Sequence, residues 1–264
     1  TSPGAGLAAA TWKRTAKLKA PTPIAEDRFG TDVALAGSRL VTSARAVDAT
    51  GNAAGIVYIF ERQASGKWLQ AATLSPDKLT PTSAFGSAIT ASGDWIVAAA
   101  MTKSIVGKTQ VDAQGLSYVF RRGAGGMWVQ TQKLVTSAKS SNWWQGSVAM
   151  HGTHLVRANP GLDYDQTSAG IVDIYRLDPS GAWLPVDVFG DTASAVVAGV
   201  SIAVGEAELV VGGNSDWKKY DGGAVSVFAL QAYVCDAYGQ CDCKPWYSGA
   251  TCDVCDKCAT VINP

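Results

Sequence analysis

The chain has 264 residues, of which 47% are hydrophobic and 17% are charged, and its 22 basic and 22 acidic side chains give a formal net charge of zero. This length holds one large domain, or one domain with a small appendage. The balanced charge, without a basic run, argues against nucleic-acid binding. The most apolar stretches, such as residues 95–101, are far shorter than the about 20 residues of a membrane-spanning helix. No secretory signal precedes Thr1, so we expect a mature or trimmed start.

Four tryptophans divide most of the chain into repeats of similar length. Trp12, Trp68, Trp128 and Trp183 follow one another at intervals of 56, 60 and 55 residues. Each begins a segment with the alternating pattern of a half-buried strand. These fourth strands of the repeats are expected at residues 12–20, 68–76, 128–136 and 183–191. Because the tryptophans recur in register, we expect them to pack between neighbouring repeats.

Three further strands are expected ahead of each tryptophan strand from Trp68 onward. The first strand follows Phe29-Gly30 or Phe85-Gly86, and Trp144-Gln145 and Ala198-Gly199 take the same place later in the chain. The second strands are apolar and lie at residues 39–44, 95–100, 154–159 and 208–213. The third strands each begin with a glycine and lie at residues 55–61, 115–121, 170–176 and 223–229. Short glycine turns join the first strand to the second and the third to the fourth, as in hairpins.

The two ends of the repeat region are complementary. Residues 12–20 form a fourth strand without the three strands before it, and the last repeat has no fourth strand after residue 230. Repeated antiparallel four-stranded units favour a propeller, because a ring protects the sheet edges. We therefore predict an all-β fold: a four-bladed β-propeller over residues 1–232, closed by the N-terminal strand, with a disulfide-rich tail at residues 233–264.

The repeats resemble a known family. The Phe-Gly start, the G-x-x-L-V turn and strand, and the G-x-V-Y-V-F strand followed by tryptophan are similar to FG-GAP repeats, the blades of integrin-α-like propellers, over residues 12–230. Calcium-binding blades of that family carry D-x-D-x-D-G between the first two strands. Here those turns read AGSR, SGDW, HGTH and VGEAE, so we expect no calcium there and no cofactor. Family members often have seven blades, so a dimer forming one larger ring is an alternative to a four-bladed monomer.

All six cysteines lie in the tail, at Cys235, Cys241, Cys243, Cys252, Cys255 and Cys258. A dense, even set in a short segment indicates disulfides made in an oxidising compartment. The alternative is a zinc site, because the last three form overlapping C-x-x-C pairs. The sequence C-D-C-K-P-W-Y-S-G-A-T-C resembles the C-terminal half of a laminin-type EGF-like module, and this resemblance implies a Cys243–Cys252 bridge with the other pairings open. We expect a secreted or cell-surface protein that meets a membrane only through a segment beyond Pro264.

The candidate binding residues lie in the connections between the second and third strands, here called the long connections: residues 44–55, 101–115, 159–170 and 213–223. They read as long and irregular, and loops on a rigid scaffold commonly carry binding. Aromatic and charged residues gather in two of them, and one more aromatic lies in a neighbouring loop: Trp217, Lys218, Lys219, Tyr220 and Asp221; Asp163, Tyr164 and Asp165; and Trp143. This composition suits a protein partner. The alternatives are a carbohydrate ligand, a structural spacer, solvated loops without a ligand, or calcium at Asp163 and Asp165, which alone supply too few oxygens.

Catalytic motifs are missing from the sequence. It contains no G-x-S-x-G, H-E-x-x-H or phosphate-binding glycine loop. His151 and His154 lie in one turn without a third metal ligand nearby in sequence, and we interpret that turn as a hairpin. The sequence predicts a binding protein and not an enzyme.

Overall fold

The structure is a computed structural model that describes residues 12–23, 27–44, 54–76, 83–106, 109–135, 146–160, 170–189, 196–215, 223–229, 234–235 and 241–242. Every regular element in these ranges is a β-strand, which confirms the all-β prediction. Within the same ranges no helix has the length and apolar character needed to cross a membrane.

Three four-stranded antiparallel sheets follow the predicted repeats. The first contains β1 (Val33–Ala36), β2 (Arg39–Ala44), β3 (Ile56–Arg62) and β4 (Trp68–Leu74). The second contains β5 (Ile89–Ser92), β6 (Trp95–Val106), β7 (Thr109–Arg122) and β8 (Trp128–Val135). The third contains β9 (Ser147–His151), β10 (His154–Asn159), β11 (Ile171–Leu177) and β12 (Trp183–Phe189). In each sheet the strands lie in chain order, as expected for hairpin-connected repeats.

Glycines in the left-handed region form the predicted turns. Gly37, Gly93 and Gly152 have φ values of 60°, 53° and 54° and are the first of two turn residues between paired strands. The residue after each has no positive φ, which is the pattern of a type II′ hairpin. Gly66, Gly126 and Gly181 have φ values between 77° and 89°. They lie in the turns that lead into the fourth strands.

The fourth sheet has three strands in the described part of the chain: β13 (Val196–Val204), β14 (Glu208–Ser215) and β15 (Ala224–Ala229). Residues 12–20 form no strand, and β15 pairs with β14 alone. The predicted closure by an N-terminal strand is therefore not found in this structure. Leu18 of this segment packs on the first sheet, and the first sheet does not pack on the fourth, so the segment does not reach the edge of β15.

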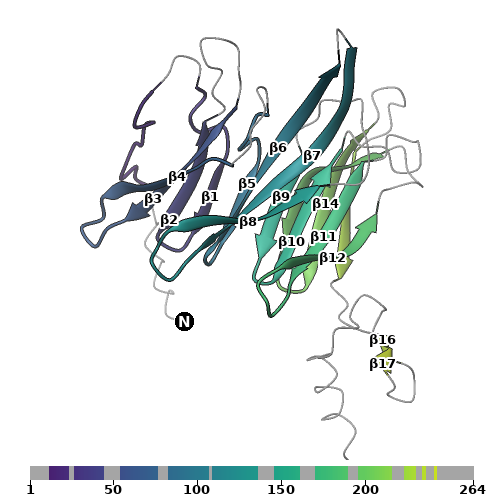
Figure 1. Cartoon of the computed structure of the whole chain (residues 1–264). Helices are drawn as coiled ribbons and strands as arrows, with labels where there is room; N and C mark the ends of the chain where they lie inside the picture. Colours follow the sequence, from purple (N-terminus) through teal and green to yellow (C-terminus); the bar gives the residue numbers. More distant parts are fainter. Residues whose placement is uncertain are drawn as a thin grey trace, which may run out of the picture.

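The four sheets stand side by side in chain order (Figure 1). Their first strands pack in sequence, β1 on β5, β5 on β9 and β9 on β13, whereas β13 and β1 do not pack in this way. In the same view the two short strands of the tail, β16 (Val234–Cys235) and β17 (Cys241–Asp242), lie below the row. The other tail cysteines lie outside the described residues.

Buried clusters fill the space between consecutive sheets. Between the first and second sheets, Val41, Val57 and Ile59 pack against the aromatic group of Phe85, Tyr118 and Phe120. Two similar clusters join the second sheet to the third and the third to the fourth. Inter-sheet packing therefore holds the row together, as in a propeller.

The repeat tryptophans have mostly the structural role that the sequence predicts. Trp183 is 1% exposed and meets Trp95 of the preceding sheet edge-on, with ring centroids 5.6 Å apart. Trp128 lies under the guanidinium of Arg39 of the preceding sheet, 4.9 Å from its ring centroid. Trp12 is fully exposed, so the prediction that it packs between repeats is wrong, because residues 12–20 join no sheet in this structure.

Candidate functional site

The predicted ligand-binding residues lie outside the described residues. This holds for Trp143, for residues 163–165 and for residues 217–221, so their positions are not tested. The structure does describe the strands from which the long connections leave: β2 and β3, β6 and β7, β10 and β11, and β14 and β15. The geometry of the candidate binding region is therefore described from the ends of these strands.

The second long connection is a β-hairpin and not an irregular loop. Pairing between β6 and β7 continues from Met101↔Gly115 to Val106↔Thr109, with one register shift between Thr102 and Ser104. The segment is rich in Thr, Val and Ile, which favour strands. Figure 1 shows this hairpin projecting from the second sheet beyond the strands of the other sheets, on the upper side of the row in this view. Sequence reasoning missed it because the length of the connection does not distinguish a paired extension from a coil.

A buried polar cluster lies at the base of this hairpin. Arg157 on β10 is 4% exposed, and its Nε lies 3.2 Å from Oδ2 of Asp173, directly opposite on β11. Its Nη2 donates a hydrogen bond of 3.1 Å to the carbonyl of Gly115 on β7, while Nη1 is buried without a hydrogen-bond partner. A Cβ at Gly115 would lie 2.8 Å from the side-chain amide nitrogen of Asn159, so the two sheets approach closely at this point. The cluster therefore fixes the hairpin base to the third sheet.

Burial sets the titration behaviour of this cluster. Burial raises the pKa of Asp173, and the Arg157 guanidinium offsets part of that rise. Burial also raises the pKa of Tyr175, and the nearby Arg157 guanidinium lowers it in part. Sequence reasoning did not single out Arg157 or Asp173. The available signal was a pair of oppositely charged residues, one in each of two apolar strands that pair with each other.

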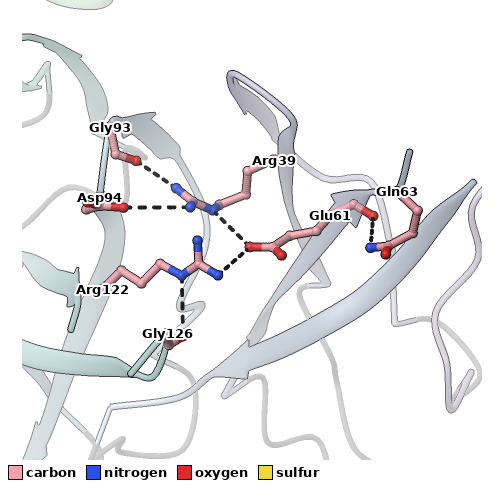
Figure 2. A network of polar contacts seen from close by, with 7 residues as sticks. All are labelled: Arg39, Glu61, Gln63, Gly93, Asp94, Arg122 and Gly126. Atoms are coloured by element: carbon pink, nitrogen blue, oxygen red, sulfur yellow. Dashed lines mark hydrogen bonds and ion pairs between the residues drawn. The ribbon is translucent and has the colours of Figure 1, made fainter. Parts of the chain in front are cut away.

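A second polar network joins the first two sheets on the opposite side of the row, beside the tight turns (Figure 2). Arg39 donates a 2.6 Å hydrogen bond to the carbonyl of Gly93 and lies 3.8 Å from the carboxylate of Asp94. Glu61 lies 3.0 Å from Arg122 and 3.7 Å from Nε of Arg39, a distance too long for a hydrogen bond. These contacts bridge the first and second sheets, so we assign them a structural role.

The two histidines face each other across their turn. His151 pairs with His154, and Gly152 supplies the positive φ of the hairpin. Burial lowers the pKa of His154, and Arg176 and His151 lower it further. In the ranges that the structure describes, no three His, Cys, Asp or Glu side chains gather as metal ligands would.

One groove lies on the fourth sheet. It has a volume of about 280 Å³ and is lined by Val200, Ser201, Gly212, Gly213, Gly223, Ala224 and Val225. These residues come from β13, β14, β15 and the residue before β15, next to the point where residues 216–222 leave the sheet. We call it the fourth-sheet groove. Its lining is almost free of polar side chains, and Ser201 supplies the one hydroxyl among the lining residues.

Comparison with known proteins identifies the repeat. Residues 12–60 match the FG-GAP repeat model. The match runs from Trp12 into β3 and confirms the predicted FG-GAP repeat in a chain with propeller-type sheets. It does not test the integrin-like or EGF-like resemblance, the number of blades or their closure. No curated protein matches the chain.

A solved structure of a GH32 β-fructofuranosidase mutant from Bombyx mori, in complex with sucrose, is similar to the chain, with 10% sequence identity and a TM-score of 0.42. The match covers 77% of this chain and 48% of the other, so the chain spans about half the length of the matched protein. The prediction that the chain is not an enzyme is contradicted by this comparison, because the matched protein is an enzyme and missing motifs do not exclude one. A likeness at this level assigns no activity to this chain.

Proposed function

We propose that the chain is an extracellular or cell-surface recognition module that binds a protein partner through its long connections. The observation that carries the proposal is the asymmetry of the row. Tight glycine turns lie along one side of the row, and the β6–β7 hairpin projects from the opposite side. Packed sheets hold the bases of these connections, and loops on such scaffolds commonly bind. The six cysteines of the tail support an oxidising, extracellular location.

Two features support a protein partner. The hairpin base is tied to the third sheet by the hydrogen bond from Arg157 to the carbonyl of Gly115. The fourth long connection carries Trp217 between charged residues, and aromatic side chains beside charge are typical anchors of protein interfaces.

The test is a pull-down from an extracellular protein fraction with the full chain as bait, followed by affinity measurement with the purified partner. The triple variant Trp217→Ala/Lys218→Glu/Lys219→Glu is compared with a control that reverses two charges at the turn end, Arg62→Glu/Lys67→Glu. We expect the triple variant to lose affinity at least about tenfold, the scale of one truncated anchor, and the control to bind normally. Equal binding by both variants would refute the assignment.

The carbohydrate and spacer alternatives give different results. Binding on a glycan array that the triple variant loses, without a captured protein, would replace the protein partner with a carbohydrate. A spacer predicts that no substitution in the long connections changes any binding.

A further inference from the structure

The fourth-sheet groove occupies the place where another sheet packs elsewhere in the row. Strand pairing establishes the equivalence: Gly212 pairs with Val225 as Ser43 pairs with Val57 in the first sheet. Gly223 precedes β15 as Gly55 precedes β3. The groove is therefore lined by the counterparts of Ser43, Gly55 and Val57.

In the first sheet these three residues hold the Phe85-Gly86 corner of the second sheet. A Cβ at Gly86 would lie 2.6 Å from the Cβ of Ser43 and 3.0 Å from Val57. A Cβ at Gly55 would overlap the backbone of Phe85, whose N–H donates a 3.0 Å hydrogen bond to the carbonyl of Ala54. Two sheets can approach this closely only because both glycines lack side chains.

The same joint recurs between the third and fourth sheets. Gly199 has φ +87°, close to the +81° of Gly86, and a Cβ there would lie 2.5 Å from Ala158. Ala158 occupies the Ser43 position, since it is the fifth residue of β10 as Ser43 is of β2. A positive-φ glycine packed on a small residue of the preceding sheet is thus a repeated joint of this fold.

The first sheet carries the other half of this joint without a partner. Gly30 has φ +90°, yet nothing lies within 4 Å of where its Cβ would be. Beside it Val33 is 63% exposed, whereas Ile89, three residues after Gly86, is 5% exposed. Phe29 contacts Tyr58 and Phe60 at centroid distances of 5.6 and 6.2 Å, as Phe85 contacts Tyr118 and Phe120 at 5.8 and 6.1 Å. The Phe29-Gly30 corner is therefore preformed and uncovered.

The open face of the fourth sheet is equally uncovered. Val225 is 70% and Val227 is 63% exposed, whereas their counterparts Val57 and Ile59 are fully buried under the second sheet. The chain thus carries two complementary apolar surfaces at the two ends of its row.

We propose that the Phe29-Gly30 corner of one copy of this chain inserts into the fourth-sheet groove of a second copy, joining the copies head to tail. A second copy is the occupant because β1 and β13 stand at the two ends of the row and do not pack together within one chain. Leu74, on the outer strand β4 of the first sheet, packs on the aromatic cluster of the second sheet. Leu18 packs in the same way on the aromatic cluster of the first sheet. Residues 12–20 therefore lie where the outer strand of a preceding sheet would lie. They would then pair with the free edge of β15 of the second copy, and each copy would complete the other's sheet.

The experiment is the solution mass of the full chain by light scattering, with variants on each surface. Val225→Asp places a charge in the groove and Val33→Asp places one beside the Phe29-Gly30 corner. Both side chains are exposed, so the fold of a single copy does not depend on them. The control is Val129→Asp, at a valine 56% exposed on the outer strand β8. We expect at least two chains for the wild type and the control, and one chain for each of the other variants.

Mixing the two variants gives a second readout. One intact groove and one intact Phe29-Gly30 corner remain between them, so the mixture should regain a species of two chains that neither variant forms alone. A single-chain wild type with amides of β15 that exchange rapidly would overturn the proposal. A single-chain wild type with protected β15 amides would also overturn it, since the chain would then close on itself. A wild-type assembly unaffected by both variants would place the contact elsewhere and overturn it too.

Discussion

The ion pair between Arg157 and Asp173 gives the sharpest test of how the sheets are joined. The same paired position in the fourth sheet holds Val211 and Ser226, so Arg157→Val and Asp173→Ser replace the charges with residues that this fold already accepts there. Arg157→Val leaves a carboxylate that is 16% exposed without its cation. Breaking a buried pair on one side costs about 3–5 kcal/mol. Because some water reaches Asp173, we expect the lower end, about 3 kcal/mol of unfolding free energy.

The double variant separates pairing from packing. If the pair is the cause, Arg157→Val/Asp173→Ser should be at least about 2 kcal/mol more stable than the sum of the single costs predicts, within the range of coupling seen for contacting residues. The assay is urea unfolding of all four proteins, followed by tryptophan fluorescence. Additive costs, or a cost below about 1 kcal/mol for Arg157→Val, would refute the assignment.

The direction in which stability changes with pH gives an independent test of the ion pair. Burial raises the pKa of Asp173 in the folded state above its value in the unfolded chain. Between these two pKa values the folded protein binds the proton more readily than the unfolded chain does. The folded protein therefore loses stability as the pH rises through this interval. Removal of Arg157 removes the opposing effect and widens the interval. The cost of Arg157→Val should therefore be smaller near pH 4 than at pH 7, because the carboxyl is then partly neutral. A cost that does not change with pH would contradict this account.

Two further predictions concern packing. Gly86→Ala and Gly66→Ala both place alanine at φ +81°, but only Gly86 lies against another sheet. We expect Gly66→Ala to lower the unfolding free energy by about 1–2 kcal/mol from backbone strain alone. Gly86→Ala should cost about 1–3 kcal/mol more, because its Cβ overlaps Ser43. Equal costs by chemical denaturation would show that the joint yields easily. Trp183→Ala should cost about 3–5 kcal/mol, because the indole is fully buried against Trp95. In a single copy, Trp12→Ala should change the unfolding free energy by less than about 0.5 kcal/mol, and a larger loss would show that Trp12 is packed.

Local pattern was sufficient to locate the strands. The second strands expected at residues 39–44 and 154–159 coincide with β2 and β10, and the tryptophan strands begin at Trp68, Trp128 and Trp183 as expected. These features depend on alternation and on turn glycines such as Gly93, which act through neighbouring residues along the chain. They can be read from sequence because the backbone conformation of a hairpin is set within a few residues.

The candidate binding residues had a weaker basis. Loop composition suggested Trp217 and its neighbours, but composition does not define geometry, and these residues lie outside the described part of the chain. The projecting β6–β7 hairpin was expected as an irregular loop, since nothing in its length distinguishes a paired extension from a coil. Its position became visible only with the pairing of Thr102–Val106 against Thr109–Gln114.

The sequence by itself determined the all-β repeat, the order of strands in each sheet and the positions of the tight turns. Only the tertiary structure decided that Arg157 of one strand reaches Gly115 of another sheet, that Gly86 packs on Ser43, and that Gly30 has no such neighbour. The physical reason is distance along the chain. Alternation and turn geometry are local, whereas contacts between sheets join residues about forty or more positions apart and depend on how whole sheets approach one another.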